Sequence, residues 1–276
     1  MKLYKTLNGI VLGYEDSLYE VEQDWDTLVN RDHLYGFLLG LMPGLKTATL
    51  SGICAPVGGQ EIWAAGVTYS RSMEARMEES KESGAADLYD RVYHAARPEL
   101  FFKSAACRVS GPGEPVYIRK DSAWNVPEPE LTLFINSNGN IQGYTAGNDM
   151  SSRSIEGENA LYLPQAKIYD RSAAIGPCLY VPESPVADDT EIAMSIFRKG
   201  ETMYHDAVKI SRMKRKHEEL AGYLFRETSF EHGCYLMTGT CLVPPNEFTL
   251  KPGDVVEISI DAIGTLKNTV SHNSHR

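Results

Sequence analysis

The sequence predicts an α+β fold rich in β-structure, and two observations lead to this prediction. Strand-like runs separated by Gly and Asn turns fill most of residues 100–180, and segments with helical spacing stand apart from them. Strands and helices do not alternate regularly, so we expect no parallel sheet built from βαβ units. The expected helices cover 70–83, 85–96 and 209–225, the first two divided at Ser83-Gly84, and the expected last strands cover 235–242 and 255–260.

The chain is predicted to divide into a small N-terminal cap domain, residues 1–60, and a larger domain, residues 61–276. The junction reads APVGG at residues 55–59, where Pro and Gly interrupt any regular element. Directly after it, residues 62–67 have the apolar pattern of a buried strand. The cap contains an apolar segment at 33–41 and strand-like runs at 9–13 and 48–54.

Composition excludes several classes of function. The chain has 276 residues, with 27 Lys and Arg against 37 Asp and Glu, a net charge of −10. Nucleic acid is a poor partner for such a protein, because binding phosphates requires clustered Lys and Arg. The best apolar run, 34–42, falls short of the about 20 residues that span a bilayer. Five cysteines without CxxC spacing indicate free thiols, and the N-terminus does not resemble a signal peptide, so we expect a cytoplasmic protein.

Three carboxylates are predicted to meet on one hairpin. Glu128 and Glu130 lie two residues apart, so they share a face if they are in a strand. Asn138-Gly139 is a strong hairpin signal, and with these as the two turn residues, opposed positions sum to 277. Glu128 then faces Asp149, because 128 + 149 = 277.

Such a cluster repels itself unless a cation lies within it, and oxygen ligands favour Mg²⁺, Mn²⁺ or Ca²⁺. The alternative is that these are ordinary solvated acids. Pro127 and Pro129 cannot donate ladder hydrogen bonds, so the strand would be an edge or bulged, and a bulge would shift the register. The histidines show no metal-ligand spacing, and we expect His272 and His275 in a disordered polar tail. The usual explanation of a lysine such as Lys167 is an ordinary surface charge. Beside three carboxylates it could instead orient them or hold a substrate carboxylate.

The order of several motifs resembles the fumarylacetoacetate hydrolase superfamily over roughly residues 60 to 270. Within it, the sequence is most similar to the 2-keto-3-deoxy-D-arabinonate dehydratase branch. The superfamily motifs are Glu128-x-Glu130, GYT at 143–145, NDMSSR at 148–153, Lys167, Gly176-Pro177, TGT at 238–240 and KPGD at 251–254. The branch-like segments are RPELFFK at 97–103, WNVPEPEL at 124–131, IEGENALYLPQ at 155–165 and MKRK at 213–216.

The resemblance implies a mixed β-roll catalytic domain (fumarylacetoacetase C-terminal-like) with a small N-terminal domain, assembled as a homodimer or homotetramer. It implies a Mg²⁺ held by Glu128, Glu130 and Asp149. It also implies that Lys167 and Thr240 contact a small 2-oxo-acid substrate.

One departure separates this chain from the hydrolytic members of the superfamily. They carry a His and Glu pair on a lid helix, and counting from Tyr69 the His position falls on Ser72. A chain without that histidine lacks the base that activates water for C–C hydrolysis. We therefore expect a lyase, with residues 70–96 as a lid that closes over the substrate and Tyr69 and Arg71 near its hinge.

The expected activity is Mg²⁺-dependent dehydration of a 2-keto-3-deoxy sugar acid, such as 2-keto-3-deoxy-D-arabinonate or xylonate, to 2,5-dioxopentanoate. Glu99 and then Glu74 are the candidates for proton transfer, although Glu74 could equally be a surface salt-bridge partner. Lys103 and Lys167 could anchor the substrate carboxylate or act as acids. Tyr69, Arg71, Gln165, Lys167 and Thr240 are the predicted substrate-binding residues. Two alternatives stay open: a Mg²⁺-dependent C–C hydrolase of an acylpyruvate or diketo acid, and a non-catalytic metal-binding member.

Overall fold

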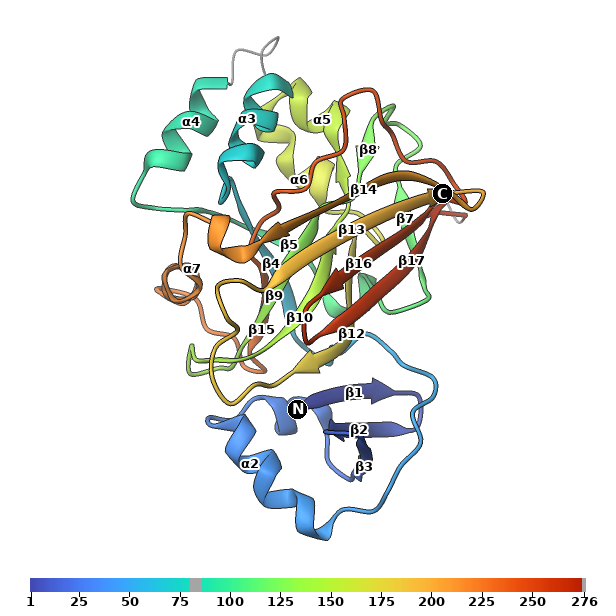
Figure 1. Ribbon diagram of the computed structural model, residues 1–276. Helices are drawn as coiled ribbons and strands as arrows, with labels where there is room; N and C mark the ends of the chain where they lie inside the picture. The colour runs from blue at the N-terminus through green and yellow to red at the C-terminus, as the bar shows by residue number, and fades with distance from the viewer. Residues whose placement is uncertain (80–85, 275–276) are drawn as a thin grey trace.

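The computed structural model describes residues 1–79 and 86–274, so the predicted break at Ser83-Gly84 lies outside the described residues. Its strands form one sheet of ten strands, one of five and one of two. The N-terminal strands and α2 lie at one end of the molecule, and α3, α4 and α5 lie at the other (Figure 1). The helices are α1 (Trp25–Val29), α2 (Leu34–Leu41), α3 (Ser70–Glu79), α4 (Ala86–His94), α5 (Arg153–Glu158), α6 (Leu163–Lys167) and α7 (His217–Leu224), with short 3₁₀ turns at Met42–Gly44, Ala106–Arg108, Ala160–Tyr162 and Ile210–Arg212.

The ten-stranded sheet has the order β3-β2-β1-β12-β10-β9-β15-β4-β5, with β6 beside β12. The pairs β4–β15 and β6–β12 are parallel and the other pairs of this sheet are antiparallel, as expected of a fold without βαβ units. The strands are β1 (Lys2–Thr6), β2 (Gly9–Tyr14), β3 (Ser17–Val21), β4 (Glu61–Gly66), β5 (Glu99–Ser104), β6 (Val109–Ser110), β9 (Pro129–Ile135), β10 (Ile141–Asp149), β12 (Ala173–Tyr180) and β15 (Cys234–Met237).

The five-stranded sheet has the order β14-β13-β16-β17-β7, and β8 and β11 form the small third sheet. A buried cluster that includes Leu133 and Ala146 of the large sheet and Met194 and Ile258 of the five-stranded sheet joins the two. The predicted α+β class is therefore correct. The strands are β7 (Pro115–Ile118), β8 (Asn125–Val126), β11 (Ser151–Ser152), β13 (Glu191–Arg198), β14 (Glu201–Lys209), β16 (Val255–Ile260) and β17 (Gly264–His272).

The N-terminal strands extend the large sheet. Strand β1 pairs with β12 through Lys2 and Leu3, and the N-terminal ammonium group donates to the Val181 carbonyl oxygen at 3.0 Å. Leu3 also shares a buried apolar cluster with Ile62 of β4. Residues 1–60 therefore contact the larger part of the chain through both a backbone ladder and a common core. The division at residues 60 and 61 stays a prediction.

The hairpin of β9 and β10 has the predicted register next to the carboxylates but a different turn. Asn136 pairs with Asn140 around three turn residues, which gives a sum of 276, and Gly139 has the positive φ (81°) that this turn requires. A bulge between Ile141 and Gly143 then adds one residue. From Gly143 onward, opposed residues sum to 277 as predicted.

Several other predicted elements are wrong in part. Residues 48–54, all of which the structure describes, contain no strand; single backbone hydrogen bonds and an isolated bridge at Ile53 join them to the N-terminal strands. The expected helix 209–225 is a 3₁₀ turn followed by α7, and the expected strand 235–242 ends at Met237.

The C-terminal strand β17 was not predicted. Its Leu266, Asn268 and Val270 are buried in strict alternation, a signal that the sequence does carry. His272 ends this strand with its Nδ1 3.2 Å from the Ile118 carbonyl oxygen, so its assignment to a disordered tail is wrong. His275 lies outside the described residues.

All five cysteines are free thiols, as predicted. Among the helices that the structure describes, none combines the length and apolar character needed to cross a bilayer.

Candidate active site

Three carboxylates meet where β9 begins and β10 ends. Glu130 lies in β9, Glu128 lies just before it, and Asp149 is the last residue of β10. One oxygen of each lies within 4.8 Å of the others, and all three side chains are buried. Because β9 lies between β10 and β15, the strand is interior, and the alternative of solvated acids on an exposed edge is wrong.

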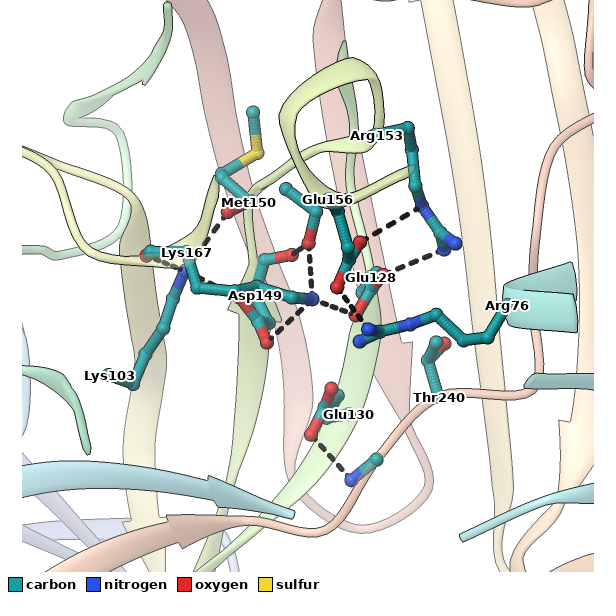
Figure 2. Close-up of polar contacts among 12 residues, drawn as sticks. Arg76, Lys103, Glu128, Glu130, Asp149, Met150, Arg153, Glu156, Lys167 and Thr240 are labelled. Atoms are coloured by element: carbon teal, nitrogen blue, oxygen red, sulfur yellow. Dashed lines mark hydrogen bonds and ion pairs between the residues drawn. The ribbon is translucent and has the colours of Figure 1, made fainter. Parts of the chain in front are cut away.

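Lys167 lies among these carboxylates (Figure 2). Its Nζ donates to Glu128 Oε2 at 2.7 Å, to Asp149 Oδ2 at 3.2 Å and to Ser151 Oγ at 2.6 Å. The side chain is fully buried at the end of α6. Lys167 is therefore a buried cation that neutralises part of the cluster, and its interpretation as a surface charge is wrong.

Lys103 approaches Asp149 from the other side. Its Nζ lies 2.5 Å from Asp149 Oδ1 and donates to the carbonyl oxygens of Met150 at 3.0 Å and Lys167 at 2.5 Å. Burial lowers the pKa of Lys103, and the charge of Asp149 opposes that shift. With these three acceptors around it, Lys103 fixes the orientation of Asp149.

The carboxylates differ in their affinity for protons. The pKa of Glu130 is raised well above its usual range, first by burial and then by the charges of Asp149 and Glu128. Burial also raises the pKa of Glu128, but neighbouring positive charges outweigh burial and hold it well below its usual range. Those charges belong to Lys167, Arg153 and Arg76. Glu130 is thus the carboxylate that most lacks a compensating cation.

Two arginines extend the cluster toward helix α3, and neither was predicted as a site residue. Arg153 Nη2 donates to Glu128 Oε1 at 2.7 Å, and Arg76 forms an ion pair with Glu156. Arg153 is the last residue of the NDMSSR motif, one of the motifs that resemble the superfamily, so the sequence did point to this position. Arg76 and Glu156 are 80 residues apart, and a single sequence gives no sign that two such residues meet.

The carboxylates line a small cavity of about 10 Å³, which is about the room that one water molecule needs and far below the size of small-molecule sites. A larger hollow over the N-terminal strands, lined by residues such as Thr6 and Glu20, shares no residue with it. The cavity is lined by Ala65, Gly66, Val67, Ser72, Arg76, Phe101, Glu128, Glu130, Asp149, Arg153, Lys167, Gly239 and Thr240.

Thr240 lines the cavity, whereas Glu99 lies behind one of the residues that line it. Thr240 is next to Gly239, whose N–H donates to Glu130 Oε2 at 2.6 Å. The Glu99 side chain lies against Gly66, another lining residue, and its Oε2 is buried. Burial raises the pKa of Glu99, and the charge of Arg76 partly opposes the shift.

Other predicted residues lie outside the cavity in this conformation. Arg71 and Glu74 are 44% and 56% exposed and pair with each other at 3.7 Å on the outer face of α3. The Gln165 side chain is exposed on α6, and Tyr69 is buried beside the start of α3 without lining the cavity. Their assignment to substrate binding, and that of Glu74 to proton transfer, stay predictions that this conformation does not support.

Ser72 occupies the position of the lid histidine and is buried at the cavity. Its hydroxyl donates to the Tyr69 carbonyl oxygen at 2.8 Å and accepts from the Tyr69 N–H at 3.2 Å. The contact with the Tyr69 N–H caps the first turn of α3, because it satisfies a backbone donor that has no partner within the helix. A hydroxyl engaged in this way provides no base comparable with an imidazole.

The larger part of the chain, which contains the three carboxylates, matches a known family. Residues 62–271 match the family described as fumarylacetoacetate (FAA) hydrolase C-terminal. This chain belongs to the fumarylacetoacetate hydrolase family. The superfamily resemblance seen in the sequence is therefore confirmed.

Within the fumarylacetoacetate hydrolase family, the chain is similar to dehydratases. It is 51% identical over 218 residues to a probable 2-keto-3-deoxyxylonate dehydratase of Haloferax volcanii, covering 78% of this chain and 74% of that protein. It is 42% identical over 219 residues to the 2-dehydro-3-deoxy-D-arabinonate dehydratase of Saccharolobus solfataricus, covering 78% and 72% of the two chains. The predicted branch is confirmed by these similarities.

A solved structure extends the similarity to the whole chain. The structure of 2-keto-3-deoxy-D-arabinonate dehydratase complexed with magnesium and 2,5-dioxopentanoate has a TM-score of 0.83, 31% identity and 99% coverage of both chains. The predicted fold of the fumarylacetoacetate hydrolase family is confirmed, because the match includes the N-terminal strands as well as the two large sheets.

Proposed function

We propose that this chain is a Mg²⁺-dependent dehydratase of a 2-keto-3-deoxy sugar acid. The favoured substrate is a five-carbon acid such as 2-keto-3-deoxy-D-arabinonate or xylonate, which loses one water to give 2,5-dioxopentanoate. The observation that carries the proposal is the buried cluster of Glu128, Glu130, Asp149 and Lys167 in a chain 51% identical to a probable 2-keto-3-deoxyxylonate dehydratase.

The donor set fits a hard divalent cation. Glu128, Glu130 and Asp149 offer only oxygen atoms, which suit Mg²⁺, with Mn²⁺ or Ca²⁺ as substitutes. The raised pKa of Glu130 supports this fit, because its carboxylate faces two like charges and needs a cation. When bound there, Mg²⁺ would supply Lewis-acid polarisation of the substrate's 2-oxo group.

The chain's own residues account for binding and proton transfer. Lys167 and Thr240, both at the cavity, would hold the substrate carboxylate. Glu99 would carry both proton transfers: its carboxylate takes the proton from C3 and then gives that proton to the C4 hydroxyl, which leaves as water. The raised pKa of Glu99 suits this role, because the group is protonated more readily than an ordinary glutamate. Lys103 is surrounded by three acceptors, so we assign it to positioning Asp149 rather than to acid catalysis.

The missing lid histidine favours dehydration over C–C hydrolysis. Ser72 is engaged in capping α3, so it cannot activate water as a histidine does. The test is to incubate the protein with Mg²⁺ and 2-keto-3-deoxy-D-arabinonate or xylonate, and to follow the products by NMR. We expect one five-carbon aldehyde acid, and its formation should stop when a chelator removes the metal.

Other results of that experiment would separate the alternatives. Two fragments from an acylpyruvate, with no turnover of the sugar acid, would favour a hydrolase. Binding of Mg²⁺ and oxalate without turnover of any 2-oxo acid would favour a non-catalytic protein. We further infer a cytoplasmic homodimer or homotetramer; the free thiols support the compartment, and sedimentation velocity would measure the assembly.

A further inference from the structure

Helix α3 carries a buried arginine into the candidate site. Arg76 is only 4% exposed although it lies on a helix at the periphery of the fold. Its guanidinium pairs with Glu156 of α5, whose side chain is 2% exposed. Figure 2 shows Arg76 reaching toward the carboxylates from the side opposite Lys103.

The pair continues toward the metal ligands. Arg153 and Glu156 lie one turn apart on α5, with 4.0 Å between Arg153 Nε and Glu156 Oε2. Arg153 Nη2 then donates to Glu128 Oε1 at 2.7 Å. Arg76, Glu156, Arg153 and Glu128 thus form a buried series of alternating charges from α3 to the metal site.

Such a series ties the position of α3 to that of Glu128. A buried charge that loses its partner is strongly destabilising, so α3 cannot move outward without exposing Glu156 to water or leaving it to Arg153 alone. In either case Arg153 divides its interactions differently between Glu156 and Glu128, so the position of the Glu128 carboxylate changes. Conversely, a Glu128 side chain fixed by a cation holds Arg153, and through it Glu156, in the orientation that receives Arg76.

We propose that Arg76 is a positioning residue that latches α3 over the cavity, and that Glu156 and Arg153 couple this latch to the metal ligand Glu128. The inference rests on the proposed metal site. Arg76 supplies no reacting group; it sets how firmly α3 closes. By linkage, occupation of the metal site favours the closed α3, and closure of α3 raises metal affinity by the same factor.

The experiment compares wild type with Arg76→Met, Glu156→Gln and the double variant. Hydrogen exchange of peptides covering residues 70–79 is measured with and without Mg²⁺, and Mg²⁺ affinity is measured by calorimetry. In the wild type we expect Mg²⁺ to slow exchange in α3. In Arg76→Met that protection should be lost, at a Mg²⁺ concentration that calorimetry shows to be saturating.

Two further variants separate coupling from simple destabilisation. Arg76→Lys keeps the charge and should restore part of the Mg²⁺-dependent protection. Arg91→Met, at an exposed arginine of α4, should behave as wild type. A merely structural Arg76 would make exchange faster by the same factor with and without Mg²⁺. The double variant replaces both charges of the pair, so it tests the latch even if Arg76→Met fails to fold.

The outcomes distinguish the latch from the function on which it rests. If Mg²⁺ binds the wild type but does not change exchange in α3, or slows exchange in α3 of Arg76→Met by the same factor, the coupling is wrong. If Mg²⁺ does not bind the wild type, the proposed metal site fails. In that case the difference in α3 exchange between metal-free wild type and Arg76→Met still decides whether Arg76 latches the helix.

Discussion

Asp149 faces Glu128 across the hairpin of β9 and β10, and its backbone N–H donates to the Glu128 carbonyl oxygen at 2.9 Å. This pairing puts both carboxylates on one side of the sheet, where Glu130 joins them. Buried like charges repel, and Lys167 supplies the cation that the structure shows between them. The hairpin therefore creates a cation site that the Lys167 ammonium group occupies, and a metal ion bound there, as proposed, would compete with it for the same carboxylates.

Glu128→Gln should abolish Mg²⁺ binding and lower turnover on the order of 100-fold or more, because it removes a charged ligand. It also removes the charge shared by Lys167 and Arg153, so thermal stability should fall while the far-UV circular dichroism spectrum stays native. Calorimetry with Mg²⁺ checks the first expectation. Glu201→Gln, at the exposed start of β14, is the control. Undiminished Mg²⁺-dependent turnover in Glu128→Gln would overturn the metal-site assignment.

Lys167→Met should have opposite effects on metal binding and on turnover. Removing an ammonium group 2.7 Å from Glu128 Oε2 removes repulsion against an incoming cation, so Mg²⁺ should bind about tenfold more tightly. Turnover should fall, because the residue proposed to hold the substrate carboxylate is lost. Calorimetry and steady-state kinetics on the same preparation measure both. Equal or weaker Mg²⁺ binding would show that Lys167 does not compete with the metal.

The sequence was sufficient to place the three carboxylates together, but partly because two errors cancelled. The assumed two-residue turn is a three-residue turn, which by itself shifts the sum of opposed positions from 277 to 276. The bulge between Ile141 and Gly143 restores 277. Turn composition identifies a hairpin, but bulges depend on packing with neighbouring strands, which sequence alone does not reveal.

The polar network around the carboxylates could not be predicted from the sequence, for a different reason. Arg76 and Glu156 come from elements that meet only in the folded chain, and each looks like an ordinary surface charge in its own segment. Lys103 was predicted as a site residue from the family resemblance, but its contact with Asp149 was not. Local patterns succeeded where the contact is local, as in the helical spacing of α3. The expected helix 209–225 failed because the buried stripe of Ile210 and Leu220 is shared by a 3₁₀ turn and α7.

Gly66→Ala should displace the Glu99 carboxyl without removing it. A Cβ on Gly66 would lie 1.9 Å from Glu99 Oε2, and the flexible end of the glutamate can turn away. We expect kcat to fall about tenfold or more, since an acid must lie within hydrogen-bond reach of its substrate. The melting temperature should stay close to that of wild type.

Gly222→Ala on α7 is the matched control, because nothing lies within 4 Å of its added Cβ and alanine favours a helix. It should leave kcat unchanged. A Gly66→Ala enzyme with normal kcat would contradict the role of Glu99.

Glu99→Gln should lower turnover and raise stability at high pH. Burial raises the pKa of Glu99 above its ordinary value of 4.5, so above that pH the folded state holds a proton that the unfolded state has lost. The stability contributed by this proton is present in full below 4.5, declines as pH rises through the folded pKa, and stays lost above it. Glutamine does not ionise, so the free energy of unfolding of the variant should exceed that of wild type more at pH 8 than at pH 5.

Urea unfolding at the two pH values measures the difference, and turnover should fall on the order of 10²-fold to 10⁴-fold. A difference in unfolding free energy that is independent of pH would mean that Glu99 is not the buried, proton-holding carboxyl proposed to act on the C4 hydroxyl.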